Sequence, residues 1–580
     1  MSVDPATVEI VRNALRDIAE EMQAMVMRAA YSTLWQEAGD LSCAVLNPDA
    51  EIVGQSERVI PVHTATMTNA TRATVEGTGG RDALQPGDVL IQNDPYAGNN
   101  HLPDVLMAQP VFGDGALLGF AAVRGHWVDV GGNSPTSYST HTGEIIQEGL
   151  RIPPAKLYRA GDRNDGLAAT ILANVRDPDE RRGDMQAQLA GVRRGAERFE
   201  ALAERHGAAT LAAALETVLG NDEATMRGAI EALPDGEYDA VDYIDGDGLE
   251  TATRLADADI SPLPIETSLQ VAGDEMRFDF QGTADQVDGG VNVPLSCTEA
   301  GAFYAVKVCL DPGDPGTLGA YRPVSVTAPT GSLVNPTYPA PVVTGNHEGA
   351  NRVFDVCVRA IAEIDPELAF GAGNGSSNGL SYRSTESGRI NREAMMGGAG
   401  ATPSRDGVNA IRSGLGNTGT QPIERVEQTY DFVTIEAFSI AQDTGGAGWR
   451  RGGNAARRET HLADPCDIVT TGDRRYTQPY GLDGGEPGTS ATDRHVTPDG
   501  EEVPLPSKIT TSIPAGSTMI VQPAGGGGFG DPHERAAAAV AADVENGYIS
   551  ADEAREVYGV AVDPETGDID QDETAMRRSE

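Results

Sequence analysis

The segment NDPYAGNNHLPD, residues 93–104, is the most informative part of the chain, because it joins a predicted strand to a loop that carries polar ligands. The apolar run at residues 89–91 predicts a short buried strand that leads into it. Its Gly, Pro, Asn and Asp residues are typical of a loop. The loop ends in His101 and Asp104, so an imidazole and a carboxylate should lie close together at one strand end.

A second segment, GHWVDVGG at residues 125–132, repeats this arrangement. His126 follows a predicted strand at residues 117–123, and Asp40 immediately precedes another at residues 41–46. Two histidines with carboxylates suit zinc, manganese or ferrous iron, and such sites leave coordination positions for water or substrate. The alternative is that the histidine and carboxylate only stabilise a turn by hydrogen bonding, and spacing alone does not exclude it.

Helical and strand patterns alternate in the first part of the chain. Apolar residues at steps of three and four predict a helix over residues 4–30, with Asp4 as its cap. Residues 41–46 and 51–53 flank the turn-forming sequence NPDA, which predicts a hairpin. An Ala- and Arg-rich helical pattern covers residues 165–233.

Short strands and glycine loops dominate residues 236–530, where helices are expected at 297–310 and 350–364. A further helix is expected over residues 534–544, and the S-x-x-E capping box at Ser550 predicts another. The predicted fold class is α+β, a large mixed body of short strands and glycine-rich loops with an N-terminal helix and a helical C-terminal segment. The expected divisions are an N-terminal metal-site region at 1–233, a mixed α+β body at 234–530, a helical segment at 531–562 and an acidic, disordered tail at 563–580.

The composition excludes several classes of protein. A net charge of −44 repels phosphate backbones, so nucleic acid is not expected as a partner. Asp and Glu are spread along the whole chain, which we interpret as adaptation to molar salt in a halophile, where the Debye length is about 3 Å. No apolar run approaches the roughly 20 residues that cross a bilayer, and no signal peptide is recognisable. We therefore expect no membrane association and a cytoplasmic location.

Several blocks together resemble the hydantoinase B/oxoprolinase family. They are DLSCA at 40–44, PVH at 61–63, the segment at 93–104, RGH at 124–126, DVGG at 129–132, Gly345-Asn346, RRGG at 450–453 and the glycine-rich stretch 525–532. The resemblance covers nearly the whole chain. It implies Asp40, His101, Asp104 and His126 as ligands of one divalent transition metal, either zinc, manganese or iron.

Three further residues each have two interpretations. His63 is either a proton-transfer group beside the metal or a hydrogen-bonded core histidine. Asp129 either accepts a hydrogen bond from a ligand histidine or caps the turn at residues 131–132. Asn346 either lines the substrate pocket or stabilises a turn. We take His63 and Asp129 as candidate catalytic residues and Asn346 as a candidate substrate-binding residue.

The resemblance also implies a function. The chain would be the metal-containing B subunit of an ATP-dependent enzyme that hydrolyses a hydantoin, 5-oxoproline or a similar cyclic amide. The glycine run at residues 525–530 is not followed by G-K-[ST], so we interpret it as a structural loop and not as a phosphate-binding loop. ATP and magnesium are therefore expected on an A-type partner subunit in a hetero-oligomer. The alternatives are the alpha subunit of an acetone- or acetophenone-type carboxylase and a non-catalytic scaffold for the A subunit.

Overall fold

The chain divides into two units by its internal contacts. The computed structural model describes residues 3–249, 261–313, 316–412 and 414–579. Contacts assign residues 1–239 and 266–357 to unit 1, and residues 240–265 and 358–580 to unit 2. The observed division therefore differs from the predicted one at residue 233, because residues 266–357, which follow a segment of unit 2, belong to unit 1. None of the described helices is long and apolar enough to cross a membrane.

Unit 1 contains a seven-stranded sheet with the order β2-β1-β5-β4-β3-β6-β7. Its neighbouring strands pair antiparallel. The strands are β1 (Leu41–Leu46), β2 (Ile52–Gln55), β3 (Val89–Gln92), β4 (Asp104–Gly113), β5 (Ala116–His126), β6 (Ala155–Arg159) and β7 (Asp162–Arg163). The predicted hairpin is confirmed as β1 and β2, and β4 and β5 form a second, longer hairpin.

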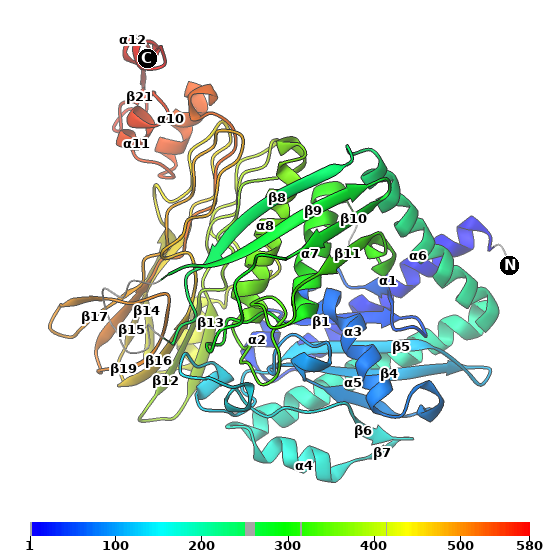
Figure 1. Ribbon diagram of the computed structural model, residues 1–580. Helices are drawn as coiled ribbons and strands as arrows, with labels where there is room; N and C mark the ends of the chain where they lie inside the picture. Colours follow the sequence, from blue (N-terminus) through cyan, green and yellow to red (C-terminus); the bar gives the residue numbers. More distant parts are fainter. Residues whose placement is uncertain (1–2, 250–260, 314–315, 413, 580) are drawn as a thin grey trace. The chain divides into compact units, whose positions relative to one another are not determined.

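Helices cover both faces of this sheet (Figure 1). They are α1 (Pro5–Ala29), α3 (Pro61–Gly77), α5 (Pro178–His206) and α6 (Ala208–Glu231), with α2 (Thr33–Gln36) and α4 (Asp165–Ala173) between them in sequence. Successive side chains of a strand point to opposite faces. Cys43 and Val45 accordingly share a core with α1, α5 and α6, whereas Ala44 and Leu46 pack with α3.

The first helix shows how closely local pattern determines structure here. The side chains of Val8, Val11 and Leu15 are buried on one face of α1, at the predicted helical spacing. Asp4 caps the helix, because its carboxylate accepts a hydrogen bond from the Thr7 backbone N–H at 3.1 Å. The predicted N-terminal helix is therefore confirmed.

A four-stranded sheet has the order β11-β10-β9-β8. Its strands are β8 (Gly236–Ile244), β9 (Leu263–Ala272), β10 (Glu275–Asp279) and β11 (Val324–Thr327). The helix α7 (Leu295–Leu310) packs against α3. A π-helical turn over Gly345–Gly349 leads into α8 (Ala350–Ala362), so both helices expected in this region are present.

Unit 2 contains two larger sheets, with the orders β13-β12-β16-β19 and β14-β15-β20-β17-β18. The strands are β12 (Gly379–Ser384), β13 (Ile390–Ala394), β14 (Val433–Ile440), β15 (Ala456–Leu462), β16 (Cys466–Thr471), β17 (Arg494–Val496), β18 (Glu502–Pro504), β19 (Lys508–Ile513) and β20 (Ser517–Val521). A short helix, α9 (Ile423–Thr429), precedes β14. The predicted α+β class is confirmed.

The C-terminal segment is helical, as expected. Its acidic tail also contains regular secondary structure. It contains α10 (Ala537–Glu545), α11 (Ala551–Glu556), β21 (Ala561–Val562), β22 (Ile569–Asp570) and α12 (Gln571–Arg577). The Ser550 hydroxyl accepts the Glu553 N–H at 3.0 Å, so the predicted helix cap is present. The tail differs from the disordered segment that we predicted. Asp570 caps α12 and the Thr574 hydroxyl accepts the Ala561 N–H, contacts that local charge does not reveal.

Glycine-rich segments of unit 2 pack backbone against backbone. Gly526 N–H donates to the Gly453 carbonyl at 2.9 Å, and Gly527 N–H donates to that of Ala372 at 2.8 Å. A Cβ on Gly526 would lie 1.9 Å from the Ala399 carbonyl oxygen, so no larger residue fits without displacing backbone. The glycine run therefore occupies a structural position.

Replacing Gly526 by alanine should destabilise the protein strongly. The added methyl group would overlap buried backbone, and we expect a loss of about 3 kcal/mol or more. The measurement is the thermal midpoint followed by circular dichroism. Gly228→Ala is the matched control, because a Cβ on Gly228 in α6 meets open space and alanine favours a helix by about 0.5–1 kcal/mol. Equal midpoints for Gly526→Ala and the wild type would contradict this packing argument.

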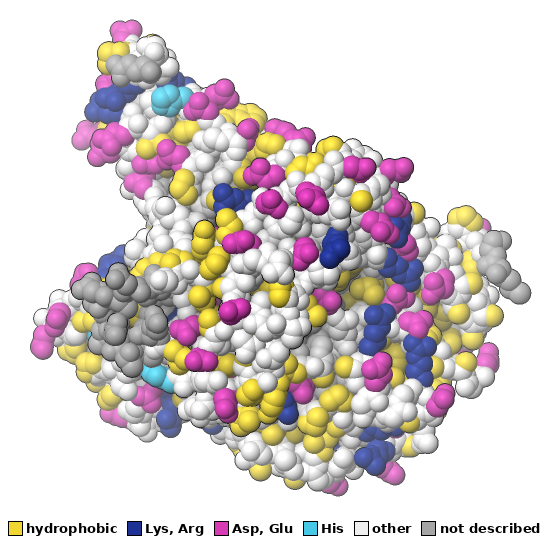
Figure 2. Space-filling model, viewed as in Figure 1, with side chains coloured by type: hydrophobic (Ala, Val, Ile, Leu, Met, Phe, Trp, Pro, Cys, Tyr) yellow, Lys and Arg dark blue, Asp and Glu magenta, His cyan; other side chains and the backbone are white. Residues whose placement is uncertain are grey.

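The acidic side chains are dispersed over the visible surface. Figure 2 shows Asp and Glu scattered across both sheets and helices on that face, with few Lys and Arg clusters between them. This distribution matches the even spread of acidic residues along the sequence. The interpretation as salt adaptation stays a prediction.

Candidate metal centre

Three adjacent strand ends of unit 1 meet at the candidate site. β1, β5 and β4 are neighbours in the seven-stranded sheet. Asp104, the first residue of β4, lies directly opposite His126, the last residue of β5. Asp40 immediately precedes β1, and its carbonyl accepts the His126 backbone N–H at 3.1 Å. Antiparallel pairing thus brings together residues that the sequence placed at separate strand ends.

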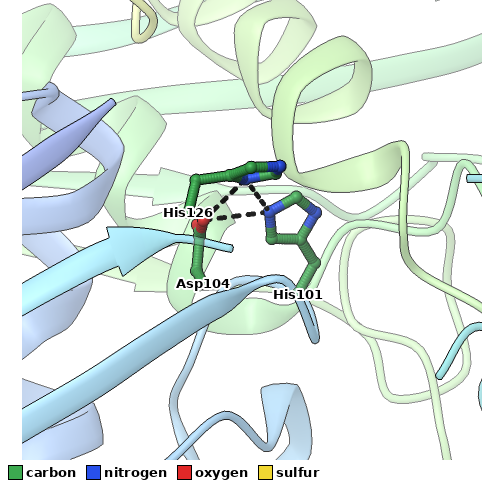
Figure 3. A group of neighbouring side chains, drawn as sticks. All are labelled: His101, Asp104 and His126. Carbon is green, nitrogen blue, oxygen red and sulfur yellow. Dashed lines mark hydrogen bonds and ion pairs between the residues drawn. The ribbon is translucent and has the colours of Figure 1, made fainter. Parts of the chain in front are cut away.

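Side-chain donors of His101, Asp104 and His126 converge on one point (Figure 3). His101 Nε2 lies 3.1 Å from Asp104 Oδ1, and His126 Nδ1 lies 3.0 Å from the same oxygen. The two ring nitrogens are 3.2 Å apart. Ligands at about 2.1 Å from a shared ion, at angles near 90–109°, lie about 3.0–3.4 Å from each other. The spacing of this donor set fits a divalent transition metal.

The hydrogen bonds and charges around these side chains suit the same role. His101 Nδ1 lies 2.9 Å from the Val343 carbonyl and donates to it, which leaves the lone pair on Nε2 toward the cluster. Burial lowers the pKa of His126, against the charges of Asp40 and Asp104. Burial opposes ionisation of Asp104, but the charges of His101 and His63 and two histidine hydrogen bonds outweigh it and hold the pKa well below its usual value. An ionised carboxylate is the form of Asp104 that ligates a metal ion.

Asp40 and His63 lie beside this cluster. His63, the third residue of α3, places Nε2 3.1 Å from Asp104 Oδ2 and 3.9 Å from Asp40 Oδ1. Asp40 is the more exposed of the two, with 16% of its side chain accessible. Among the described residues, only His101, Asp104 and His126 form a group of three or more His, Cys, Asp or Glu side chains whose donor atoms all lie within 4.8 Å of one another. Asp40, predicted as a fourth ligand, thus stands at the edge of the group.

The structure separates the two remaining candidates. Asn346, in the π-helical turn, places Nδ2 3.3 Å from His101 Nε2 and so borders the cluster. Asp129 instead accepts the Gly131 N–H at 3.0 Å and binds Arg176 at 2.6 Å. His101 directs its outer nitrogen to Val343, so Asp129 does not orient it. The contacts of Asp129 therefore match its interpretation as a turn residue, and not its interpretation as an acceptor for a ligand histidine.

Arg124 and Asn100 are neighbours of the site for which we predicted no role. The Arg124 guanidinium donates to the His63 carbonyl and to Asn100 Oδ1, both at 2.9 Å. Asn100 Nδ2 in turn donates to Asp104 Oδ2 at 2.9 Å. Burial lowers the pKa of Arg124 to about 10, against the opposing charge of Asp104, so the group is still cationic at neutral pH. Both residues lie within two positions of a predicted ligand in the sequence, which was the available signal.

Glu148 holds the segment that orients His101. Its Oε1 accepts the Val342 N–H at 2.8 Å and the Val343 N–H at 2.9 Å. The Val343 carbonyl then receives the His101 Nδ1–H. Burial raises the pKa of Glu148 to about 8, against these two hydrogen bonds. The buried carboxyl group of Glu148 thereby positions Val343, which in turn orients the candidate ligand His101.

Glu148→Gln should make stability less sensitive to pH. The folded-state pKa of about 8 lies above the ordinary value of 4.5, so the wild type loses stability as pH rises through this interval. The glutamine oxygen accepts the same two N–H groups and does not titrate. We expect the thermal midpoint of Glu148→Gln relative to the wild type to increase from pH 5 to pH 8. Glu76→Gln, at an exposed position on α3, serves as the control, and a pH-independent difference would contradict the prediction.

Comparison with known proteins extends over almost the whole chain. The hydantoinase B/oxoprolinase family model matches residues 4–532. An uncharacterised protein of Methanocaldococcus jannaschii is 33% identical over 579 residues, which cover 99% of this chain and 100% of that protein. Caprolactamase subunit beta of Pseudomonas jessenii is 30% identical, with coverage of 100% and 99%. The crystal structure of the ATP-dependent caprolactamase from P. jessenii has a TM-score of 0.90 at 28% identity and 100% coverage of both chains. The chain belongs to the hydantoinase B/oxoprolinase family.

Proposed function

We propose that this chain is the metal-containing B-type subunit of an ATP-dependent cyclic amide hydrolase. The observation that carries the proposal is the convergence of three buried donor atoms from His101, Asp104 and His126 at neighbouring strand ends. The similarity to a caprolactamase subunit, and to a crystal structure of an ATP-dependent caprolactamase, supports a cyclic amide as the substrate class. The bond to be hydrolysed is then the ring C–N bond.

The residues of the site would bind the metal, restrain its carboxylate ligand and contact the substrate. His101, Asp104 and His126 would hold a divalent zinc, manganese or iron ion. Such an ion lowers the pKa of bound water and polarises a carbonyl group. His101 and His126 contact Asp104 Oδ1, whereas His63 Nε2 lies 3.1 Å from Asp104 Oδ2. His63 therefore restrains the carboxylate through its other oxygen. Asn346 borders the cluster and presents an amide that would hydrogen-bond the substrate.

ATP would act on a partner and not on this chain. The sequence contains no phosphate-binding loop followed by Lys-Ser/Thr. The name of the P. jessenii relative, subunit beta, points to an assembly of more than one kind of chain. We propose an A-type subunit that phosphorylates the amide oxygen and passes the activated ring to the metal centre.

Reconstitution with the A-type protein tests this division. The isolated chain should hydrolyse neither ATP nor a cyclic amide. Mixed with the A-type protein, it should form a hetero-oligomer whose ATP turnover depends on a hydantoin, 5-oxoproline or a lactam. Ring opening by the chain alone would contradict the two-subunit proposal. Consumption of bicarbonate with a ketone, without ring opening, would replace it by a carboxylase.

A further inference from the structure

A hydrogen-bonded series of three side chains lies beside the metal centre and has no part in the account above. Tyr138 is 1% exposed, His347 is 8% exposed and Glu348 is fully buried. His347 Nδ1 lies 2.8 Å from Glu348 Oε1, and its Nε2 lies 3.1 Å from the Tyr138 hydroxyl. All three residues belong to unit 1. The burial of three linked polar groups at one place points to a function beyond packing.

The direction of these hydrogen bonds follows from their chemistry. A carboxylate only accepts, so Glu348 receives the Nδ1–H of His347. The lone pair of Nε2 then accepts the hydroxyl proton of Tyr138. This is the direction found in Ser-His-Asp triads, with tyrosine in place of serine. An oxygen that donates its single proton to His347 meets any further group only as an acceptor.

The series is adjacent to the candidate ligands. The Tyr138 ring centroid lies 6.0 Å from that of His101 and 6.2 Å from that of His126. His347 follows Asn346 directly, and its ring centroid is 6.2 Å from that of His101. The phenol ring therefore borders both histidines of the proposed centre.

The backbone around Tyr138 is held in an unusual conformation. Thr136 and Ser137 both have positive φ angles, 65° and 63°, which residues other than glycine rarely adopt. The Ser137 hydroxyl donates to the Gly131 carbonyl and accepts the Val130 N–H, which fixes this turn. Such strain persists where the surroundings determine one position, and it is common beside active sites. The turn fixes the place of the Tyr138 ring.

We infer that Tyr138 accepts a hydrogen bond from the water molecule that attacks the amide carbon, and thereby orients it. His347 and Glu348 are positioning residues, because they commit the hydroxyl proton and leave the tyrosine oxygen as an acceptor. The inference rests on the proposed hydrolysis of a cyclic amide. An N–H group of the substrate is the alternative donor to the Tyr138 oxygen. That contact would contribute to substrate binding and not to the attack by water.

Tyr138→Phe tests this role in the complex with the A-type subunit. The variant keeps the ring and removes the oxygen, and misplacement of an attacking group costs about 100-fold in rate. We expect kcat for ring opening to fall by about that factor, with KM and metal content unchanged. In NMR spectra of protein labelled with ¹⁵N at histidine, the His347 Nε2 resonance should shift, while the signal of the Nδ1 proton should remain. Tyr31→Phe, at a side chain that is 65% exposed, is the control.

The outcomes separate this inference from the function on which it rests. A wild-type complex that opens no cyclic amide would overturn both. An active wild type with a Tyr138→Phe variant within threefold of its kcat would overturn only the role of Tyr138. A rise in KM at constant kcat would also overturn it, because Tyr138 would then bind the substrate. Loss of metal from Tyr138→Phe would assign the residue to the metal site instead.

Discussion

Replacing His101 by alanine is expected to strip the protein of most of its metal. His101 supplies one of three converging donors, and Nε2 lies 3.1 Å from Asp104 Oδ1. Loss of even an outer-shell partner weakens metal binding about 10–100-fold, so loss of a ligand should do at least that. The measurement is elemental analysis after desalting. The wild type should hold close to one ion per chain, and the variant a small fraction of that.

A matched histidine gives the control for this experiment. His206 ends α5, outside the group of three donors, so His206→Ala should keep the wild-type metal content. Retention of full metal in His101→Ala would exclude the proposed centre. A metal-free wild type that is active with its partner would exclude a metal from the reaction altogether.

Asp104→Asn should uncouple ATP cleavage from ring opening. Asp104 contacts three histidines, at 3.0–3.1 Å, and asparagine would replace its negative charge by a neutral amide. Activation of water at the site would weaken, and we expect ring opening to slow by about 100-fold or more, because loss of a residue that only supports a metal ligand already costs about 10–100-fold. The A-type subunit keeps its own ATP site, so ADP should continue to form. The measured quantity is the ratio of ring-opened product to ADP.

The control for Asp104→Asn lies in the same hairpin. Asp114 is an exposed residue of the β4–β5 turn with a φ of 51°, a conformation that asparagine also tolerates. Asp114→Asn should keep the product-to-ADP ratio of the wild type. If Asp104→Asn lowered ADP formation and ring opening equally, the division of labour between the subunits would be wrong.

Local pattern predicted the elements but not their partners. The helix at α1, the hairpin of β1 and β2 and the cap at Ser550 each depend on residues a few positions apart, so periodicity and capping chemistry suffice. The return of residues 266–357 to unit 1 depends on contacts between distant segments. Nothing in the local sequence of those residues specifies that pairing.

The candidate site was predictable to a similar extent. His101, Asp104 and His126 follow or precede strands, and the pairing of β4 with β5 brings them together. Glu148 and Val343 are 195 residues apart, and Val343 is 242 residues from His101. Such long-range hydrogen bonds leave no periodic trace in the sequence. For the same reason the contact of Asp129 with Arg176, 47 residues away, was not predicted, whereas its contact with the Gly131 turn was one of the two interpretations.

The most direct test of the account is to remove the metal and restore it. The purified chain is stripped with a chelator, combined with the A-type subunit and assayed for ADP and ring-opened product, before and after addition of zinc, manganese or ferrous iron. We predict that the stripped complex cleaves ATP without opening the ring, and that one of the three ions restores ring opening in the wild type but not in His101→Ala. Ring opening at the full rate by the stripped complex would contradict the central claim that the centre at His101, Asp104 and His126 performs the hydrolysis.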